Sequence, residues 1–378
     1  MIYADHAATT KISETAKLAM LSAMEKDWYN PSSLYTPGQQ ASGTLMDARV
    51  RIAHCLGCLP KEIYFTSGGS EADNQAILSA AAIGKRQGKM HIISTAFEHH
   101  AVLHTLKKLE KEGFEITLLD VGEKGIVSPV QVEKAIRPDT ILVTVMYANN
   151  EIGTIQPIRE IGAICRKNGV LFHTDAVQAA GHRQINVEKD QIDMLSLSAH
   201  KFNGPKGIGV LYAKTGVFLT NLIEGGGQER GKRAGTENLP AIVGMVAALE
   251  EACSLQKERS IYVTKLRDQL IDGLKKIPGA LLNGDATNRL PGNVNFCFPD
   301  TEAEGLLLLL DNKGICASSG SACTSGFLDP SHVLLAIGRD PQTARGSLRL
   351  TLDYENTPEE VETIIEAVTD TVRILRGC

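Results

Sequence analysis

Lys201 is the residue whose surroundings most clearly point to chemistry. The apolar residues 192–197 before it predict a short buried strand, and Gly204-Pro-Lys-Gly207 after it predicts a turn into a further strand at 210–212. Desolvation disfavours an ammonium ion, so a lysine amine at a buried strand end becomes a nucleophile toward aldehydes. A lysine taken alone is most often a solvated surface residue, so the assignment depends on what accompanies it.

A carboxylate and a glycine-rich turn accompany this lysine. Asp175 ends an apolar strand predicted at 170–174, where it either caps the next helix or pairs with a cationic ring nitrogen. Thr66-Ser-Gly-Gly-Ser-Glu71 lies between a strand at 62–66 and a helix running to about residue 83, and such a helix start favours a phosphate. Pyridoxal phosphate (PLP) requires a Schiff-base lysine, a carboxylate for its pyridinium nitrogen and a phosphate cradle. The three features together predict a PLP site, with Ser70, Ser198 and His200 as further phosphate ligands.

Two further loops carry side chains that suit the same cofactor. His99 follows a strand predicted at 90–94, and an imidazole there could lie over the ring and exchange protons, although a single histidine is often an ordinary loop residue. Asn149 and Asn150 follow the strand at 141–146 and offer uncharged donors for a phenolic oxygen.

The C-terminal third adds a cysteine and two arginines. Cys323 lies among small residues in 316–326, a composition that predicts an exposed loop whose thiol could reach a substrate, or an incidental surface thiol. The stretch 345–352 predicts a strand with alternating sides. Arg345 and Arg349 on it compete as the residue that clamps a substrate carboxylate.

The elements that must position these residues alternate between strand and helix from about residue 60 to 215. Further strands are predicted at 116–119, with helices at 100–111 and 158–168. This alternation predicts an α/β fold with a large, mostly parallel sheet, whose ligands bind at the carboxyl ends of the strands. A long helix is predicted at 238–258 and a final helix at 357–376. We expect a large domain at 15–255 and a smaller α+β domain from 1–14 plus 256–378.

Composition sets limits on the function. The 378 residues carry a net charge of −5, with 43% apolar, 22% charged and 5% aromatic residues, which argues against nucleic acid as a partner. No apolar run approaches the length of a membrane span and no signal peptide is visible, so we expect a cytoplasmic protein. We expect the eight cysteines to be reduced thiols. Cys55 and Cys58 lack the second ligand pair of a zinc site, so no metal is expected.

With these residues in place, the chain resembles the cysteine desulfurases of the NifS/IscS type, which are fold-type-I PLP enzymes related to class-V aminotransferases. The resemblance covers nearly the whole chain. It rests on Tyr3-Ala-Asp-His-Ala-Ala-Thr-Thr10, Asn30-Pro-Ser-Ser33, Thr66-Ser-Gly-Gly-Ser-Glu71, Glu98-His99, Asn149-Asn-Glu-Ile-Gly153, His173-Thr-Asp-Ala-Val-Gln178, Ser198-Ala-His-Lys201, Arg233-Ala-Gly-Thr-Glu-Asn238, Ser318-Ser-Gly-Ser-Ala-Cys323 and Ser347-Leu-Arg349.

The resemblance implies a role for each matching residue. Lys201 would form the Schiff base and move the α-proton, and His99 would stack on the ring. Arg349, rather than Arg345, would bind the substrate carboxylate, and Cys323 would be the nucleophile. The remaining cofactor ligands would be Asp175 at the pyridinium, Gln178 and Asn150 at the phenolic oxygen, and Gly69, Ser70, Ser198 and His200 at the phosphate, with Thr236 reaching the phosphate of a neighbouring subunit in a homodimer.

The implied reaction converts L-cysteine to L-alanine and leaves a persulfide on Cys323. The sulfur would pass to an acceptor protein, either an iron–sulfur scaffold or a tRNA-thiolating enzyme. Alternatives are a selenocysteine lyase, an aminotransferase on the same scaffold, or a non-catalytic sulfur-relay subunit. An aminotransferase has no use for Cys323, and retention of Lys201 and Asp175 argues against a non-catalytic subunit.

The chain departs from the family pattern at three places. His6 stands where asparagine is usual, Tyr35 where a histidine often follows Asn-Pro-Ser-Ser, and Gly69-Ser70 where Ala-Thr is commoner. Ser70 keeps the hydroxyl, so phosphate binding is expected to survive. Tyr35 leaves the detail on the substrate side open.

Overall fold

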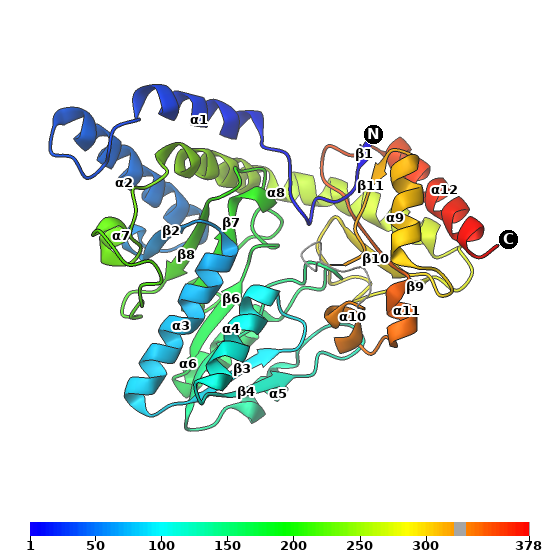
Figure 1. Cartoon of the computed structure of the whole chain (residues 1–378), viewed down its shortest axis with the longest axis horizontal. Helices are drawn as coiled ribbons and strands as arrows, with labels where there is room; N and C mark the ends of the chain where they lie inside the picture. Colours follow the sequence, from blue (N-terminus) through cyan, green and yellow to red (C-terminus); the bar gives the residue numbers. More distant parts are fainter. Residues whose placement is uncertain (321–329, 378) are drawn as a thin grey trace.

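A seven-stranded sheet forms the centre of the larger part of the molecule in the computed structural model, which describes residues 1–320 and 330–377 (Figure 1). Its strand order is β2-β8-β7-β6-β5-β3-β4. The strands are β2 (Ile63–Thr66), β3 (His91–Thr95), β4 (Glu115–Leu119), β5 (Thr140–Thr144), β6 (Leu171–Asp175), β7 (Met194–Ser198) and β8 (Gly209–Ala213). The strands predicted between residues 60 and 175 lie within two residues of these bounds.

The directions of the strands place strand ends that carry polar residues at one edge of this sheet. Strands β4, β3, β5, β6 and β7 run parallel, whereas β8 is antiparallel to both β7 and β2. In the register of β6 and β7, Asp175 pairs with Ser196, and Ser198 pairs with Gly209 on β8. The predicted α/β class with a mostly parallel sheet is therefore confirmed.

Helices cover both faces of the sheet, because alternate strand residues point to opposite sides. Ile92 and Leu142 pack with helices α3 and α4, and their neighbours Ile93 and Val143 pack on the opposite face with α2, α6 and α8. The helices of this part are α1 (Glu14–Lys26), α2 (Thr36–Leu56), α3 (Gly69–Gln87), α4 (His100–Lys111), α5 (Pro129–Ala135), α6 (Ile158–Asn168) and α7 (Gln228–Gly231), with 3-10 turns η1 (Pro60–Glu62) and η2 (Ala199–Lys201).

Helix α8 (Leu239–Leu274) connects the two parts of the molecule and is longer than the sequence predicts. The predicted helix ends near residue 258, but the helix continues for four more turns. The charged stretch 257–260 resembles a helix end. In the structure it is the solvated part of α8 between two apolar cores. Leu249 and Ala252 before it belong to the core of the large sheet, and Val263 and Leu270 after it belong to a second core.

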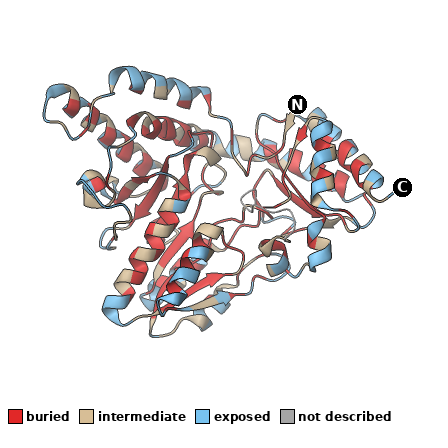
Figure 2. Ribbon diagram, viewed as in Figure 1, coloured by how far each residue is buried: buried red, intermediate tan, exposed pale blue. Residues whose placement is uncertain are grey.

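By length and composition alone, α8 could cross a membrane, but 56% of its most apolar window is buried inside the protein. A core helix passes the same test, and Figure 2 shows much of the α8 ribbon in the colour of buried residues. Among the described residues, α8 is the one helix that meets these criteria.

The second core is built around a three-stranded antiparallel sheet, β12-β10-β9, and a short parallel pair, β1–β11. Because β1 pairs with β11, the chain begins beside its C-terminal third before it crosses to α1 (Figure 1). The elements are β1 (Ile2–Tyr3), β9 (Leu281–Leu282), β10 (Asn293–Cys297), α9 (Ala303–Asn312), β11 (Ile315–Cys316), α10 (His332–Ala336), α11 (Pro341–Arg345), β12 (Ser347–Thr351) and α12 (Pro358–Leu375).

The strand predicted at 345–352 is shorter and more buried than expected. Arg345 ends the exposed helix α11, and β12 begins only at Ser347. All five residues of β12 are buried, so the strand has no solvent-facing side. Its outer edge is covered because the backbones of Asp5 and Ser318 pair with Thr351 and Arg349.

A buried ion pair holds α2 and α7 against β2. The Arg49 guanidinium contacts the Glu229 carboxylate and also donates to the Ile63 carbonyl at 2.8 Å. Glu229 in turn accepts from the Phe65 amide at 2.9 Å, although Glu229 itself has a left-handed backbone (φ +47°). Such a backbone is costly for a residue with a side chain, so these bonds stabilise an otherwise unfavourable turn.

We expect Arg49→Ala to lower the free energy of unfolding by about 3 to 5 kcal/mol, because it leaves the buried Glu229 carboxylate without its cation. Arg51→Ala is the matched control on the same helix. Arg51 pairs with Glu250 at a half-exposed position, so its loss should cost only ~0–1 kcal/mol. Chemical denaturation of both variants measures the difference, and equal losses would contradict the importance of the buried pair.

Candidate active site

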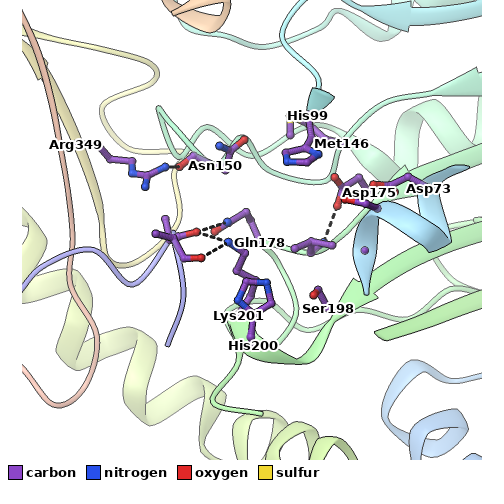
Figure 3. A pocket seen from close by; sticks show the side chains of 15 residues that line it. Asp73, His99, Met146, Asn150, Asp175, Gln178, Ser198, His200, Lys201 and Arg349 are labelled. Carbon is purple, nitrogen blue, oxygen red and sulfur yellow. Dashed lines mark hydrogen bonds between the residues drawn. The ribbon is translucent and has the colours of Figure 1, made fainter. Parts of the chain in front are cut away.

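The carboxyl ends of the parallel strands open into a cavity of about 230 Å³ (Figure 3). Most of the residues singled out from the sequence line it. They are Gly69, Ser70, His99, Asn150, Asp175, Gln178, Ser198, His200, Lys201 and Arg349. Five further lining residues were not predicted: Ala7, Ala8, Asp73, Met146 and Val177.

Lys201 lies in the η2 turn directly after β7, as its sequence context predicts. Its Nζ atom donates hydrogen bonds to the carbonyl oxygens of Ala7 at 2.6 Å and Ala8 at 2.7 Å. Gln178 also donates to the Ala7 carbonyl, at 3.0 Å. The crossing segment between β1 and α1 therefore forms one wall of the cavity, a role that the sequence analysis did not assign to it.

Asp175 ends β6 inside the cavity and lies in a fully buried position. Burial raises the pKa of its carboxyl to about 6, while a hydrogen bond from the Val177 amide (2.9 Å) and the charge of Lys201 oppose the rise. A turn rather than a regular helix follows this residue, so the alternative role as a helix cap is wrong. A carboxylate in this setting can pair with a cationic ring nitrogen.

Asp73 and His173 form a second polar layer behind Asp175. Burial and the charge of Asp175 raise the pKa of Asp73 well above its usual value, and burial lowers the pKa of His173 to about 3. The His173 ring contacts Ser196 Oγ at 3.0 Å and Thr144 Oγ1 at 2.8 Å. Asp73 could not be found from sequence, because an acidic residue in a helix is usually a solvated one.

The start of α3 has the features of a phosphate cradle. Gly68 is its N-cap and has no side chain to satisfy the first helical amides. A Cβ atom on Gly69 would lie 2.6 Å from Val177 Cγ2, so a side chain at this position would require Val177 to shift. Ser198 faces the same turn, with its Oγ atom 3.7 Å from where a Cβ of Gly68 would be.

His200 and His99 flank the cavity as neutral rings. Burial and the Lys201 charge lower the pKa of both imidazoles to about 4, and nearby His332 and His104 add to the effect on His99. The Ala101 amide donates to His99 Nδ1 at 3.1 Å, so the proton of the neutral ring is on Nε2. His99 therefore has a fixed tautomer and an N–H available on its other side.

The structure decides between the two adjacent asparagines. Asn149 is buried and holds its own turn, because its Oδ1 accepts from the amides of Glu151 and Ile152 and its Nδ2 donates to the Phe97 carbonyl. Asn150 lines the cavity instead. The family resemblance names Asn150, and the turn conformation is what places this residue, rather than Asn149, at the cavity.

The structure also separates the two candidate arginines. Arg349 is 1% exposed and lines the cavity, where Nη1 donates to the Asn150 carbonyl at 3.2 Å and Nη2 to Asp5 Oδ1 at 2.8 Å (Figure 3). Arg345 is exposed on α11 and does not line the cavity. Of the two, Arg349 is positioned to bind an anion there.

The remaining predicted features do not line this cavity in the part of the chain that the structure describes. Thr236 lines a separate cavity of about 60 Å³ with Ser67 and Arg233. Cys323 lies outside the described residues. Cys55 lies in the last turn of α2, where it forms a thiol hydrogen bond with Cys253, and Cys58 follows the C-cap residue Gly57. No metal-binding group of His, Cys, Asp or Glu occurs in the described ranges.

Known proteins share this fold and sequence over their whole length. A model of the class-V aminotransferase family matches residues 2–364. A cysteine desulfurase IscS of Methanosarcina thermophila is 52% identical over 376 residues, covering 100% of this chain and 93% of the relative. A solved NifS-like protein superposes with a TM-score of 0.92 at 36% identity, covering 99% of both chains. The structure of SspA in complex with cysteine gives a TM-score of 0.82 at 37% identity, covering 93% of this chain and 99% of that one.

The lysine, carboxylate and helix start at the sheet edge, together with these matches, define a PLP-dependent enzyme of the class-V aminotransferase type. Within that class, the chain belongs to the family of IscS and NifS-like cysteine desulfurases.

We expect the His99 ring to titrate near pH 4 in the cofactor-free protein. Because an exposed imidazole titrates near 6.5, the unfolded chain binds a proton between these pH values that the folded chain does not. The contribution of His99 to stability is thus complete above pH 6.5 and is lost as the pH falls to about 4. Histidine NMR titration measures the midpoint.

Lys201→Met separates the two causes of this shift. Removing the lysine charge should raise the His99 pKa, but not to 6.5, because burial is the larger cause. A midpoint at 6.5 in the unmodified protein would contradict the burial of the ring, and an unchanged midpoint in the variant would contradict the influence of Lys201.

Proposed function

We propose that the protein releases L-alanine from L-cysteine and collects the sulfur as a persulfide on Cys323. The observation that carries the proposal is the meeting of Lys201, Asp175 and Arg349 in one cavity, which offers an amine, a buried carboxylate and an anion site to a bound amino acid. The identity to a cysteine desulfurase over the full chain supports the choice of substrate.

The residues around the cavity fit PLP. Its aldehyde would meet Lys201 and its pyridinium nitrogen Asp175. The free amides of Gly69 and Ser70, with Ser198 and His200, would hold the phosphate, because a helix start without a side-chain cap retains unpaired N–H donors. Gln178 and Asn150 would serve the phenolic oxygen, and His99 would lie against the ring. Bound there, PLP withdraws electrons from the α-carbon of an amino acid.

The charge and position of the other side chains suggest which would bind the substrate and which would transfer protons. Arg349 binds the substrate carboxylate through its free donors. Lys201, which would hold the cofactor aldehyde in the resting enzyme, would take the α-proton of the substrate on Nζ. The neutral His99 ring, with its proton on Nε2, can exchange a proton with a group over the cofactor ring without adding positive charge beside Lys201.

Cys323 would complete the sulfur transfer. Its thiolate attacks the substrate sulfur, the carbon–sulfur bond breaks, and the electron pair of that bond remains with the substrate carbon skeleton, which becomes alanine after protonation. The product on the enzyme is Cys323–S–SH. A reductant or an acceptor protein must remove the outer sulfur before the next turnover.

We also propose the setting in which this activity operates. Residues 15–255 form the PLP-binding lobe, and 1–14 plus 256–378 form a smaller lobe that carries Cys323. The enzyme acts as a cytoplasmic homodimer in which Thr236 reaches the phosphate of the neighbouring subunit, a role that its position outside the cavity of its own chain supports. An iron–sulfur scaffold or a tRNA-thiolating enzyme accepts the sulfur, without nucleic acid or membrane as a direct partner.

Alanine release from L-cysteine in the presence of a thiol reductant tests the proposed reaction. We expect alanine and sulfide in equal amounts from the wild type and almost none from Cys323→Ala. Cys316→Ala is the matched control, because Cys316 lies in β11. Equal rates in wild type and Cys323→Ala would show that Cys323 is not the nucleophile and would favour a lyase that releases the chalcogen directly.

Arg349→Lys tests the carboxylate site. A lysine presents a point charge instead of a planar fork, so we expect the KM for L-cysteine to rise about tenfold or more. Arg345→Lys, on the exposed end of α11, should leave KM within about twofold of wild type. Similar KM values in both variants would contradict the assignment of Arg349.

A further inference from the structure

Asp5 lies beside the cavity and contacts Arg349 directly. Its Oδ1 atom accepts from Arg349 Nη2 at 2.8 Å, and its Oδ2 atom accepts from Ser318 Oγ at 3.0 Å. The Asp5 side chain is 15% exposed and that of Arg349 only 2%. One oxygen of the Asp5 carboxylate thus contacts Arg349 of β12, and the other contacts Ser318, whose backbone pairs with that strand.

The guanidinium of Arg349 is held at two points and keeps donors free. Nη1 donates to the Asn150 carbonyl and Nη2 to Asp5, whereas the buried Nε has no hydrogen-bond partner among the described residues. A guanidinium has more N–H groups than these two bonds use. The remaining donors suit an anion entering the cavity that Arg349 lines (Figure 3).

Two-point attachment matters because an arginine side chain is long and has many rotamers. Freezing it when substrate binds would weaken binding, and a side chain already fixed in the free enzyme avoids that loss. A single bond to the Asn150 carbonyl would still allow the guanidinium plane to rotate. The second bond, from Asp5, defines the plane that a carboxylate must match.

Asp5 is itself fixed by its backbone. Its main chain bridges to Thr351, and the Ala7 amide donates to Thr351 Oγ1 at 2.9 Å. The Tyr3 hydroxyl bonds to the carbonyls of Asp5 (3.1 Å) and Thr9 (2.8 Å). The carboxylate therefore projects from a segment tied to β12, the strand that carries Arg349.

We propose that Asp5 is a positioning residue that orients Arg349 and thereby sets the affinity for an amino-acid substrate with an α-carboxylate. The proposal rests on the proposed function, in which Arg349 binds that carboxylate. Asp5 acts through Arg349 alone and takes no part in bond breaking.

The test compares Asp5→Ala and Asp5→Asn in the PLP-loaded enzyme. We expect Asp5→Ala to raise the KM for L-cysteine about tenfold while kcat stays within about threefold, because substrate binding is lost rather than chemistry. Asparagine keeps an acceptor oxygen and the same shape, so Asp5→Asn should keep KM within about threefold of wild type. The dissociation constant of L-alanine, measured by calorimetry, should rise in parallel with KM.

Asp353→Ala is the matched control for a general disturbance of this region. Asp353 is also buried, lies two residues after the end of β12 and accepts from the Tyr354 amide, but it does not line the cavity. Its KM should remain at the wild-type value. If Asp5→Ala does not fold, Asp5→Ser replaces it, since a serine hydroxyl fills the polar space but is too short to bridge to Arg349.

A wild type that releases no alanine overturns the proposed function and this proposal with it. A wild type that does release alanine, beside a folded alanine or serine variant with unchanged KM, overturns the role of Asp5 alone. An asparagine variant as impaired as the alanine variant also overturns it, because charge rather than orientation would then be what Asp5 supplies.

Discussion

Charge buried at one edge of a parallel sheet is the constraint on which the rest of this structure depends. Asp175 and Arg349 are buried there and Lys201 is partly buried beside them, and a charge removed from water is tolerated only with a partner. The partners come from remote parts of the chain. Backbone carbonyls of residues 7 and 8 accept from the lysine, and Asp5 pairs with the arginine.

This requirement explains the path of the N-terminal segment. The chain pairs with β11, passes along β12, and then crosses to α1 (Figure 1). On the way it supplies the Asp5 carboxylate to Arg349 and two backbone carbonyls to Lys201. A short segment without regular structure thus links the core around β12 to the core around β7, and α8 makes the second connection.

Two further buried carboxyl groups, those of Asp73 and Glu98, affect the wall of the cavity. Asp73 and Glu98 are fully buried and carry pKa values above their usual range, with that of Glu98 raised to about 8 by burial. Glu98 accepts from the Met146 amide and the Thr95 hydroxyl, so it joins the loop that carries His99 to the loop that carries Asn150. Because its pKa is about 8, the Glu98 carboxyl fixes the cavity wall while adding little negative charge beside Asp175 at neutral pH.

Local patterns in the sequence were sufficient for the strands of the large sheet and for the residues at their ends. An apolar run followed by Lys201 or Asp175 identifies a buried strand and a polar end, and parallel strands bring such ends together. The same local patterns misplaced the end of α8 and the start of β12. The charged stretch 257–260 and Arg345 both resemble solvated residues. Only the packing of the two cores shows that α8 continues through 257–260 and that β12 begins after Arg345.

The sequence by itself therefore determined the kind of fold, the cofactor and most of the residues that meet around it, because strand ends and glycine turns are short-range features. Tertiary structure alone showed that Ala7 and Ala8 form part of the cavity wall and that Asp5 pairs with Arg349 beside it. These contacts join residues more than 190 positions apart, as between Lys201 and Ala8 or Asp5 and Arg349. No local sequence pattern predicts contacts between residues so far apart in the chain, because these contacts form only when the two separately packed cores come together.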